Sequence, residues 1–144
     1  MDFATSVRTC FAKYVDFSGR ARRSEFWWFV LFTAIVGIIA SVIDEVLGTD
    51  YDTRQGGLVN TLASLVLIHP QLAVGARRLH DIGKSGWWQL LGIIPIIGWI
   101  FLLIWFCTDS RRGDNHYGPS PKQEPGAYQP PAPPPPYGSG PYGS

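Results

Sequence analysis

Three long apolar runs alternate with short polar segments along this chain. The first, FWWFVLFTAIVGIIASVI at residues 26–43, has 18 residues and no charge. The second, at 58–76, has 19 residues, and His69 is its one titratable side chain. The third, WWQLLGIIPIIGWIFLLIWFC at 87–107, has 21 uncharged residues, and Pro95 predicts a kink within it. At about 1.5 Å per residue, each run is long enough as a helix to cross a hydrocarbon core.

The lengths of these runs favour a bilayer protein over a soluble one. The residues outside them are mostly short loops, charged flanks and a Pro-rich end, too few to cover three buried helices. A cleaved signal peptide does not fit the first run, because 25 residues precede it and two further apolar runs follow. The predicted fold class is therefore all-α, an integral membrane helical bundle with three transmembrane helices.

Two further segments flank this bundle. Apolar residues between Phe3 and Val15 recur at helical spacing on one face, which predicts an amphipathic helix that either lies in the headgroup plane or packs on the bundle. The chain ends in QPPAPPPPYGSGPYGS, a composition that cannot form a core and is typical of disorder with polyproline II stretches. The predicted domains are thus a multi-pass membrane domain at 1–121 and a disordered Pro/Gly/Tyr-rich tail at 122–144.

The distribution of Lys and Arg predicts the orientation. Five precede the first run, whereas the loop at 44–57 has only Arg54 among several acidic residues. Basic residues near span ends favour the cytoplasm, so we expect a cytoplasmic N-terminus and an exterior acidic loop. Three full spans would leave Arg111 and Arg112 outside, against this preference. A bend in the third run would return them, but each arm of the bend would be too short to span.

Composition excludes several classes of protein. Twelve Lys and Arg against eleven Asp and Glu give a net charge of +1, which excludes a basic nucleic-acid binder. Two cysteines cannot build a disulfide framework or a four-ligand zinc site. The chain has no phosphate-binding loop, nucleophile elbow, zinc-protease motif or dinucleotide fingerprint. The sequence therefore predicts no enzyme activity, no metal and no cofactor.

Polar motifs border the apolar runs: FSGRARRSEFWW at 17–28, ARRLHDIGKSGWW at 76–88 and CTDSRRGDNHYGP at 107–119. The first two should share the inner face, where guanidinium groups can bind lipid phosphates while tryptophans anchor helix ends. The structural alternative is that these residues only orient the protein. The candidate lipid- or partner-binding residues are Arg20, Arg22, Arg23, Trp27, Trp28, Arg77, Arg78, His80, Asp81, Lys84, Trp87 and Trp88.

Two positions carry a more specific hypothesis. Arg77, Arg78, His80 and Asp81 could hold a phosphate or transfer a proton, although Asp81 neutralising Arg77 or Arg78 at a helix end is the structural alternative. His69 lies inside an apolar run, where a titratable group is a candidate functional site. It stands beside Pro70, whose missing N–H frees a backbone carbonyl, and the alternative is a neutral histidine bonded to such a carbonyl.

The chain resembles the bacterial family called domain of unknown function 805, the YhaH-like small inner-membrane proteins. The resemblance rests on YVDFSGRARRSEFWWFVLF at 14–32, LAVGARRLHDIGKSGWWQLL at 72–91 and FCTDSRRGDNHYGPSP at 106–121. It covers about residues 1–121, and the tail departs from the compact members. It implies a multi-pass helical protein of the bacterial cytoplasmic membrane, and it supplies no catalytic residue.

The expected function follows from these features. We expect a non-enzymatic inner-membrane protein whose basic Arg/Trp rim engages anionic phospholipid headgroups or a membrane partner. Small residues such as Gly37, Ala40 and Ser41, or Gly92 and Gly98, would also permit a homo-oligomer. The alternatives are an oligomeric transporter or channel subunit that uses His69, and a phospholipid-modifying enzyme that uses the cluster at 77–81.

Overall fold

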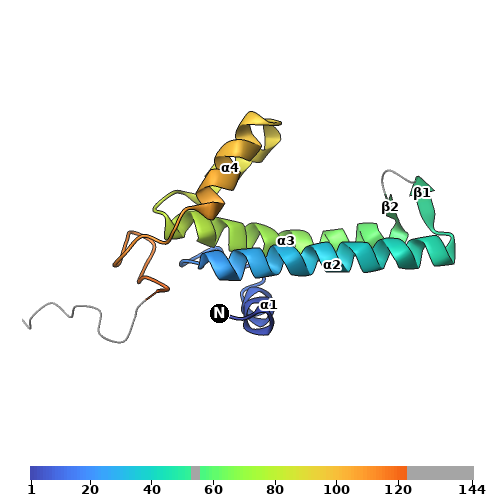
Figure 1. The fold of residues 1–144 in the computed structure, drawn as a ribbon, viewed down its shortest axis with the longest axis horizontal. Helices are drawn as coiled ribbons and strands as arrows, with labels where there is room; N and C mark the ends of the chain where they lie inside the picture. Colours follow the sequence, from blue (N-terminus) through green and yellow to red (C-terminus); the bar gives the residue numbers. More distant parts are fainter. Residues whose placement is uncertain (53–55, 123–144) are drawn as a thin grey trace, which may run out of the picture.

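Two long antiparallel helices dominate the fold (Figure 1). The computed structural model describes residues 1–52 and 56–122. Helix α2 (Arg23–Leu47) and helix α3 (Leu58–Asp81) have 25 and 24 residues, so each is roughly 36 Å long. They are joined through a short antiparallel ladder of β1 (Asp50–Asp52) and β2 (Gly56–Gly57). Both helices are long and apolar enough to cross a membrane.

The turn between the two helices is fixed by Asp44. Its buried carboxylate accepts hydrogen bonds from the backbone N–H groups of Val59 and Asn60, both at 2.8 Å, and so caps the N-terminus of α3. The hydroxyl of Thr49 donates to the same carboxylate at 2.6 Å. A Cβ at Gly57 would collide with the Asp44 side chain, so the approach of α3 to α2 here requires glycine.

The predicted N-terminal helix is present as α1 (Phe3–Ala12) and runs across α2 (Figure 1). Phe3 meets Trp28 edge-on with ring centroids 5.8 Å apart, and Phe11 contacts both Phe29 and Phe32 at under 6 Å. Edge-to-face aromatic pairs of this kind add to the burial of apolar area. Of the two positions predicted for this segment, the structure has the helix packed on the bundle.

The third apolar run differs from the prediction of a single spanning helix. Residues 87–107 form two shorter elements, the 3₁₀ helix η1 (Gly86–Ile93) and the 11-residue helix α4 (Ile97–Cys107). Between them Ile96 has φ +66° and ψ −68°, and the Ile97 N–H donates to the Pro95 carbonyl at 2.8 Å. This is a γ-turn with a positive central φ, a strained conformation for a branched residue. It reverses the chain at the proline for which a kink was expected.

Close contacts hold η1 and α4 together as a hairpin. A Cβ at Gly98 would collide with the Leu91 carbonyl, so only glycine permits this approach. The Trp99 indole N–H donates to the Gly92 carbonyl at 2.9 Å. Trp88 and Trp105 meet edge-on with ring centroids 5.7 Å apart. The chain therefore leaves the end of α3 and comes back to it, and the described residues contain two helices of spanning length, not three.

The surfaces of α2 and α3 are unlike those of core helices in soluble proteins. Only 17% and 22% of their most apolar segments are buried within the molecule. Ile38, Val42, Leu62 and Leu65 each expose more than half of their surface. Large continuous apolar surfaces of this kind mark contact with lipid or another chain. Of the predicted disordered tail at 122–144, residues 123–144 lie outside the described residues.

Candidate functional site

The three polar motifs meet at one end of the helix pair, where α2 begins and α3 ends. We call this assembly the cap; it consists of residues 17–28, 76–88 and 107–119. The first two motifs lie together as expected. The third joins them because the η1–α4 hairpin returns the chain: the Arg78 guanidinium donates from Nε to the Phe106 carbonyl at 3.2 Å and from Nη2 to the Thr108 carbonyl.

Asp81 lies at the centre of the cap between two arginines. Its Oδ1 accepts from Arg20 Nε at 3.0 Å, and its Oδ2 accepts from Arg78 Nη1 at 2.7 Å. The side chains of Asp81 and Arg78 are fully buried, and that of Arg20 is nearly so. A buried charge requires a partner of opposite sign, and here one carboxylate serves two guanidinium groups.

The rest of the Arg20 guanidinium holds the segment that follows α4. Its Nη1 donates to the carbonyls of Gly113 and Gly118 at 2.8 and 3.3 Å. Its Nη2 donates to the carbonyls of Arg111 and Asp81 at 2.6 and 3.2 Å. Five donors in a planar fork suit guanidinium to this role. Arg20, which precedes α2, therefore ties the end of α3 to the segment after α4.

A second buried ion pair joins α2 to α3. Arg77 Nη1 lies 2.5 Å from Glu25 Oε1, and both side chains are buried. Cys10 of α1 approaches the same carboxylate, with its Sγ 3.9 Å from Glu25 Oε1. Burial, aided by the Glu25 charge, raises the pKa of the Cys10 thiol to about 12. The thiol is therefore protonated and a poor nucleophile at neutral pH.

His80 fixes the third motif against the first. Its Nδ1 lies 3.1 Å from the Gly19 carbonyl, which favours the tautomer with a proton on Nδ1. Its ring stacks on Tyr117 with centroids 4.0 Å apart and planes 3° from parallel. The His80 carbonyl accepts from Asn115 Nδ2 at 2.8 Å. The ring is half-buried and acts in packing.

The outer surface of the cap carries the exposed tryptophans. Trp27 and Trp28 expose 37% and 38% of their surface at the start of α2, and Trp88 and Trp87 expose 49% and 79% in η1. Lys84 is half-buried, with its Nζ 4.4 Å from the centre of the Trp105 ring. These tryptophans and Lys84 are among the predicted site residues that the fold leaves accessible.

Arg22 and Arg23 contact the end of the described chain. Arg22 Nε donates to the Pro121 carbonyl. Arg23 donates to the Cys107 carbonyl at 3.2 Å and lies 3.4 Å from the Asp109 carboxylate. Asp109 also pairs with Lys122, whose hydrogen bond holds the pKa of that carboxyl below its usual value. Unlike the buried pairs, the side chains of Arg23 and Asp109 are 45% and 60% exposed, so these contacts add little stability.

The comparisons with known proteins address the same region. A family model described as "Protein of unknown function (DUF805)" matches residues 14–119, which is more than half of the chain and includes all three cap motifs. The chain belongs to the DUF805 family. This confirms the resemblance predicted from the motifs.

The DUF805 relatives agree on a membrane location. The chain is 48% identical over 109 residues to "Inner membrane protein YhaI" of Escherichia coli (strain K12), covering 76% of this chain and 88% of that protein. It is 41% identical over 114 residues to "Inner membrane protein YhaH" of the same strain, covering 78% of this chain and 92% of that protein. No solved structure matches the chain. These relatives confirm the predicted location in a membrane.

His69 lies apart from the cap of this DUF805 protein. It is exposed on α3, and its ring stacks on Tyr14 with centroids 5.9 Å apart. The carbonyl freed by Pro70 is that of Val66, one helical turn earlier, and the Tyr14 hydroxyl donates to it. Pro70 therefore leaves α3 continuous, and a tyrosine from the segment after α1 supplies the missing donor.

Sequence reasoning missed several partners of the cap residues. Glu25 stands near Arg22 and Arg23 in the sequence, whereas in the structure it pairs with Arg77, 52 residues away. No local pattern in the sequence indicated that the cap is held together by contacts of Arg20, Asn115 and Tyr117. Arg78 and Asp81 are fully buried and paired with each other, so these two residues are closed to a phospholipid headgroup. Within residues 1–52 and 56–122, no three His, Cys, Asp or Glu side chains form a metal site.

Proposed function

We propose that this DUF805 chain crosses the inner membrane twice, through α2 and α3, with the cap on the cytoplasmic side. The return of the η1–α4 hairpin supports this topology. It places the segment with Arg111 and Arg112 beside the N-terminal basic residues, so eleven of the twelve Lys and Arg flank one side and only Arg54 flanks the other. That asymmetry is stronger than three full spans would give, and it follows the positive-inside rule.

The function that this geometry supports best is non-enzymatic recognition of anionic phospholipid headgroups by the outer surface of the cap. The observation that supports this function is that the cap residues fall into a buried group and an exposed group. Arg20, Arg77 and Arg78 are buried and neutralised from within by Asp81 and Glu25, so they build the cap. The four exposed tryptophans and the more peripheral cations face outward.

The charge of the cap suits an anionic surface. Its three segments carry eight basic and four acidic residues. Two of the acids pair with three buried arginines, which leaves five basic and two acidic residues for the rest of the cap. Tryptophan rings settle at the headgroup level, and each Lys or Arg near an anionic membrane surface contributes about 1 kcal/mol. Lys84, beside Trp105 and next to the exposed Trp87 and Trp88, and the exposed Arg112 are the cations best placed for this contact.

The test is headgroup selectivity in vesicles. The full chain is reconstituted in phosphatidylcholine vesicles, and the association of spin-labelled phosphatidylglycerol is compared with that of spin-labelled phosphatidylcholine. We expect a preference for phosphatidylglycerol that falls by about tenfold or more in Lys84→Gln/Arg112→Gln, at about 1 kcal/mol per cation. The matched control Lys84→Arg/Arg112→Lys keeps the charge and should keep the preference.

Two results would overturn the headgroup proposal. One is a wild-type protein that shows no preference for phosphatidylglycerol. The other is an unchanged preference in the neutralised variant, because neither outcome can come from contacts made by these cations.

A further inference from the structure

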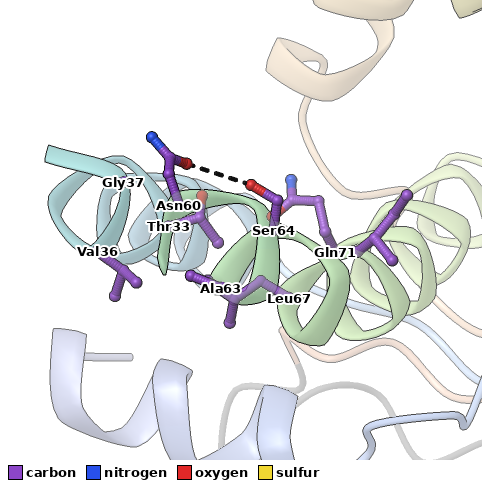
Figure 2. A pocket seen from close by; sticks show the side chains of 9 residues that line it. Thr33, Val36, Gly37, Asn60, Ala63, Ser64, Leu67 and Gln71 are labelled. Atoms are coloured by element: carbon purple, nitrogen blue, oxygen red, sulfur yellow. Dashed lines mark hydrogen bonds between the residues drawn. The ribbon is translucent and has the colours of Figure 1, made fainter. Parts of the chain in front are cut away.

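A mainly apolar groove that also contains several polar side chains lies between α2 and α3, away from the cap (Figure 2). Its volume is about 270 Å³. Thr33, Val36 and Gly37 of α2 line one side. The α3 side is lined by Asn60, Ala63, Ser64, Leu67, Ile68 and Gln71.

In the two-span topology proposed above, the groove lies at hydrocarbon depth. Ser64 and Gln71 are six and thirteen residues from the start of α3, which places them about 9 and 20 Å along the helix axis. Thr33 lies about 15 Å along α2 from its own start at the cap. Polar side chains at such depths in membrane proteins face protein or water rather than lipid tails, which cannot form hydrogen bonds.

The hydrogen bonds within one chain leave this groove incompletely satisfied. Asn60 Nδ2 donates to Ser41 Oγ at 2.7 Å. Ser64 Oγ donates to Asn60 Oδ1 at a long 3.4 Å, and Figure 2 draws this second bond as a dashed line. Gln71 Oε1 is buried without a partner among the described residues. Amide and hydroxyl groups can each donate and accept, so the groove can pair with a surface like itself.

The groove also allows close approach of another backbone. A Cβ at Gly37 would have no atom within 4 Å, so the glycine leaves a notch open to the outside. Gly37 lies one helical turn from Thr33 and one from Ser41. Small residues at four-residue spacing let helices in membranes approach closely enough to pack and form hydrogen bonds.

We propose that this groove is the contact surface for a second copy of the chain. A partner within the bilayer must bring donors and acceptors to the depth of Asn60, Ser64 and Gln71, and a second copy in the same orientation does so by symmetry. The contact is isologous, with the two grooves facing across a twofold axis along the membrane normal. The proposal rests on the groove and on the proposed two-span topology, and it does not depend on headgroup binding by the cap.

The test is oxidative cross-linking of the full chain in vesicles. The exposed Cys107 is replaced by serine and the buried Cys10 is kept. Gly37→Cys and Ser64→Cys are compared with Ile35→Cys and Leu62→Cys, each two residues away and thus about 200° around the same helix at similar depth. We expect cross-linked dimer at both groove positions, at least fivefold above the controls. Equal or stronger cross-linking at the control positions would overturn the proposal.

A second measurement guards against a cross-link that traps random collisions. Gly37→Leu fills the notch, and we expect it to reduce the dimer fraction at least tenfold when dilution in lipid is followed by energy transfer between labelled copies. Ile35→Leu, which keeps the volume on the opposite face, should leave that fraction unchanged. A wild-type chain that is monomeric at all protein-to-lipid ratios, or a Gly37→Leu variant that dimerises like the wild type, would contradict the inference.

Discussion

Replacement of Asp81 by asparagine removes the one carboxylate that faces both Arg20 and Arg78. The substitution barely changes volume, so its effect on folding reports charge and hydrogen bonding. Both arginines lie within 3.0 Å of the carboxylate in a site closed to solvent. Removing one partner of a buried ion pair costs about 3–5 kcal/mol, because the remaining charge stays desolvated. Arg20 and Arg78 retain carbonyl acceptors, so we expect a loss near the lower limit, about 3 kcal/mol.

The free energy of unfolding can be measured for the full chain in mixed micelles, with tryptophan fluorescence followed as the denaturing detergent is increased. The matched control is Asp109→Asn, which neutralises a carboxylate in the same cap. Asp109 is 60% exposed, and ion pairs at such exposed sites contribute little to stability because solvent screens them. If Asp81→Asn were no less stable than Asp109→Asn, the buried network would not hold the cap together.

Three further predictions test other parts of the structure. Gly98→Val places a side chain against the Leu91 carbonyl and should lower the free energy of unfolding by about 1–3 kcal/mol. The control Gly92→Ala, whose methyl would meet only Leu102 at 3.6 Å, should cost less than about 1 kcal/mol. Equal free energies of unfolding for the two variants would contradict the hairpin. Tyr14→Phe removes the donor to the Val66 carbonyl and should lower the free energy of unfolding by about 1 kcal/mol. The loss should be smaller in a Pro70→Ala background, because the backbone N–H of residue 70 returns there. A double-mutant cycle measures this coupling, and strictly additive losses would refute it. Burial raises the pKa of the Cys10 thiol from 9.0 to about 12, so the contribution of this thiol to stability is complete below pH 9 and is lost as pH rises toward 12. In that interval the free energy of unfolding of Cys10→Ala should therefore depend less on pH than that of the wild type. An unchanged pH dependence would argue against the burial of Cys10.

The two long helices were readable from the sequence because local composition determines them. Each of the first two runs is apolar over a spanning length, and in the structure each forms one continuous helix with polar residues at its cap end. The third run passed the same test of length and composition. What divides it is the γ-turn at Ile96 and the contact at Gly98, and neither changes the average apolarity of the run.

The candidate site was readable in composition but not in its pairings. Arg20, Arg77, Arg78 and Asp81 were identified as candidates, yet Arg20 reaches Asp81 across 61 residues of chain. Such pairs depend on how α2 and α3 pack, which local patterns do not report. The carbonyl that Pro70 frees was foreseen from the proline alone, whereas Tyr14 as its donor depends on the path of the chain after α1.

The most direct test of the two-span topology is the side of the membrane on which the chain emerges after α4. A topology reporter fused after Pro121 is compared with one inserted in the loop between α2 and α3, each expressed on the full preceding chain. We predict a cytoplasmic signal after Pro121 and an exterior signal from the loop, because the hairpin returns the third motif to the cap. An exterior signal after Pro121 would mean that residues 87–107 cross the membrane, and that the three motifs never meet on one face.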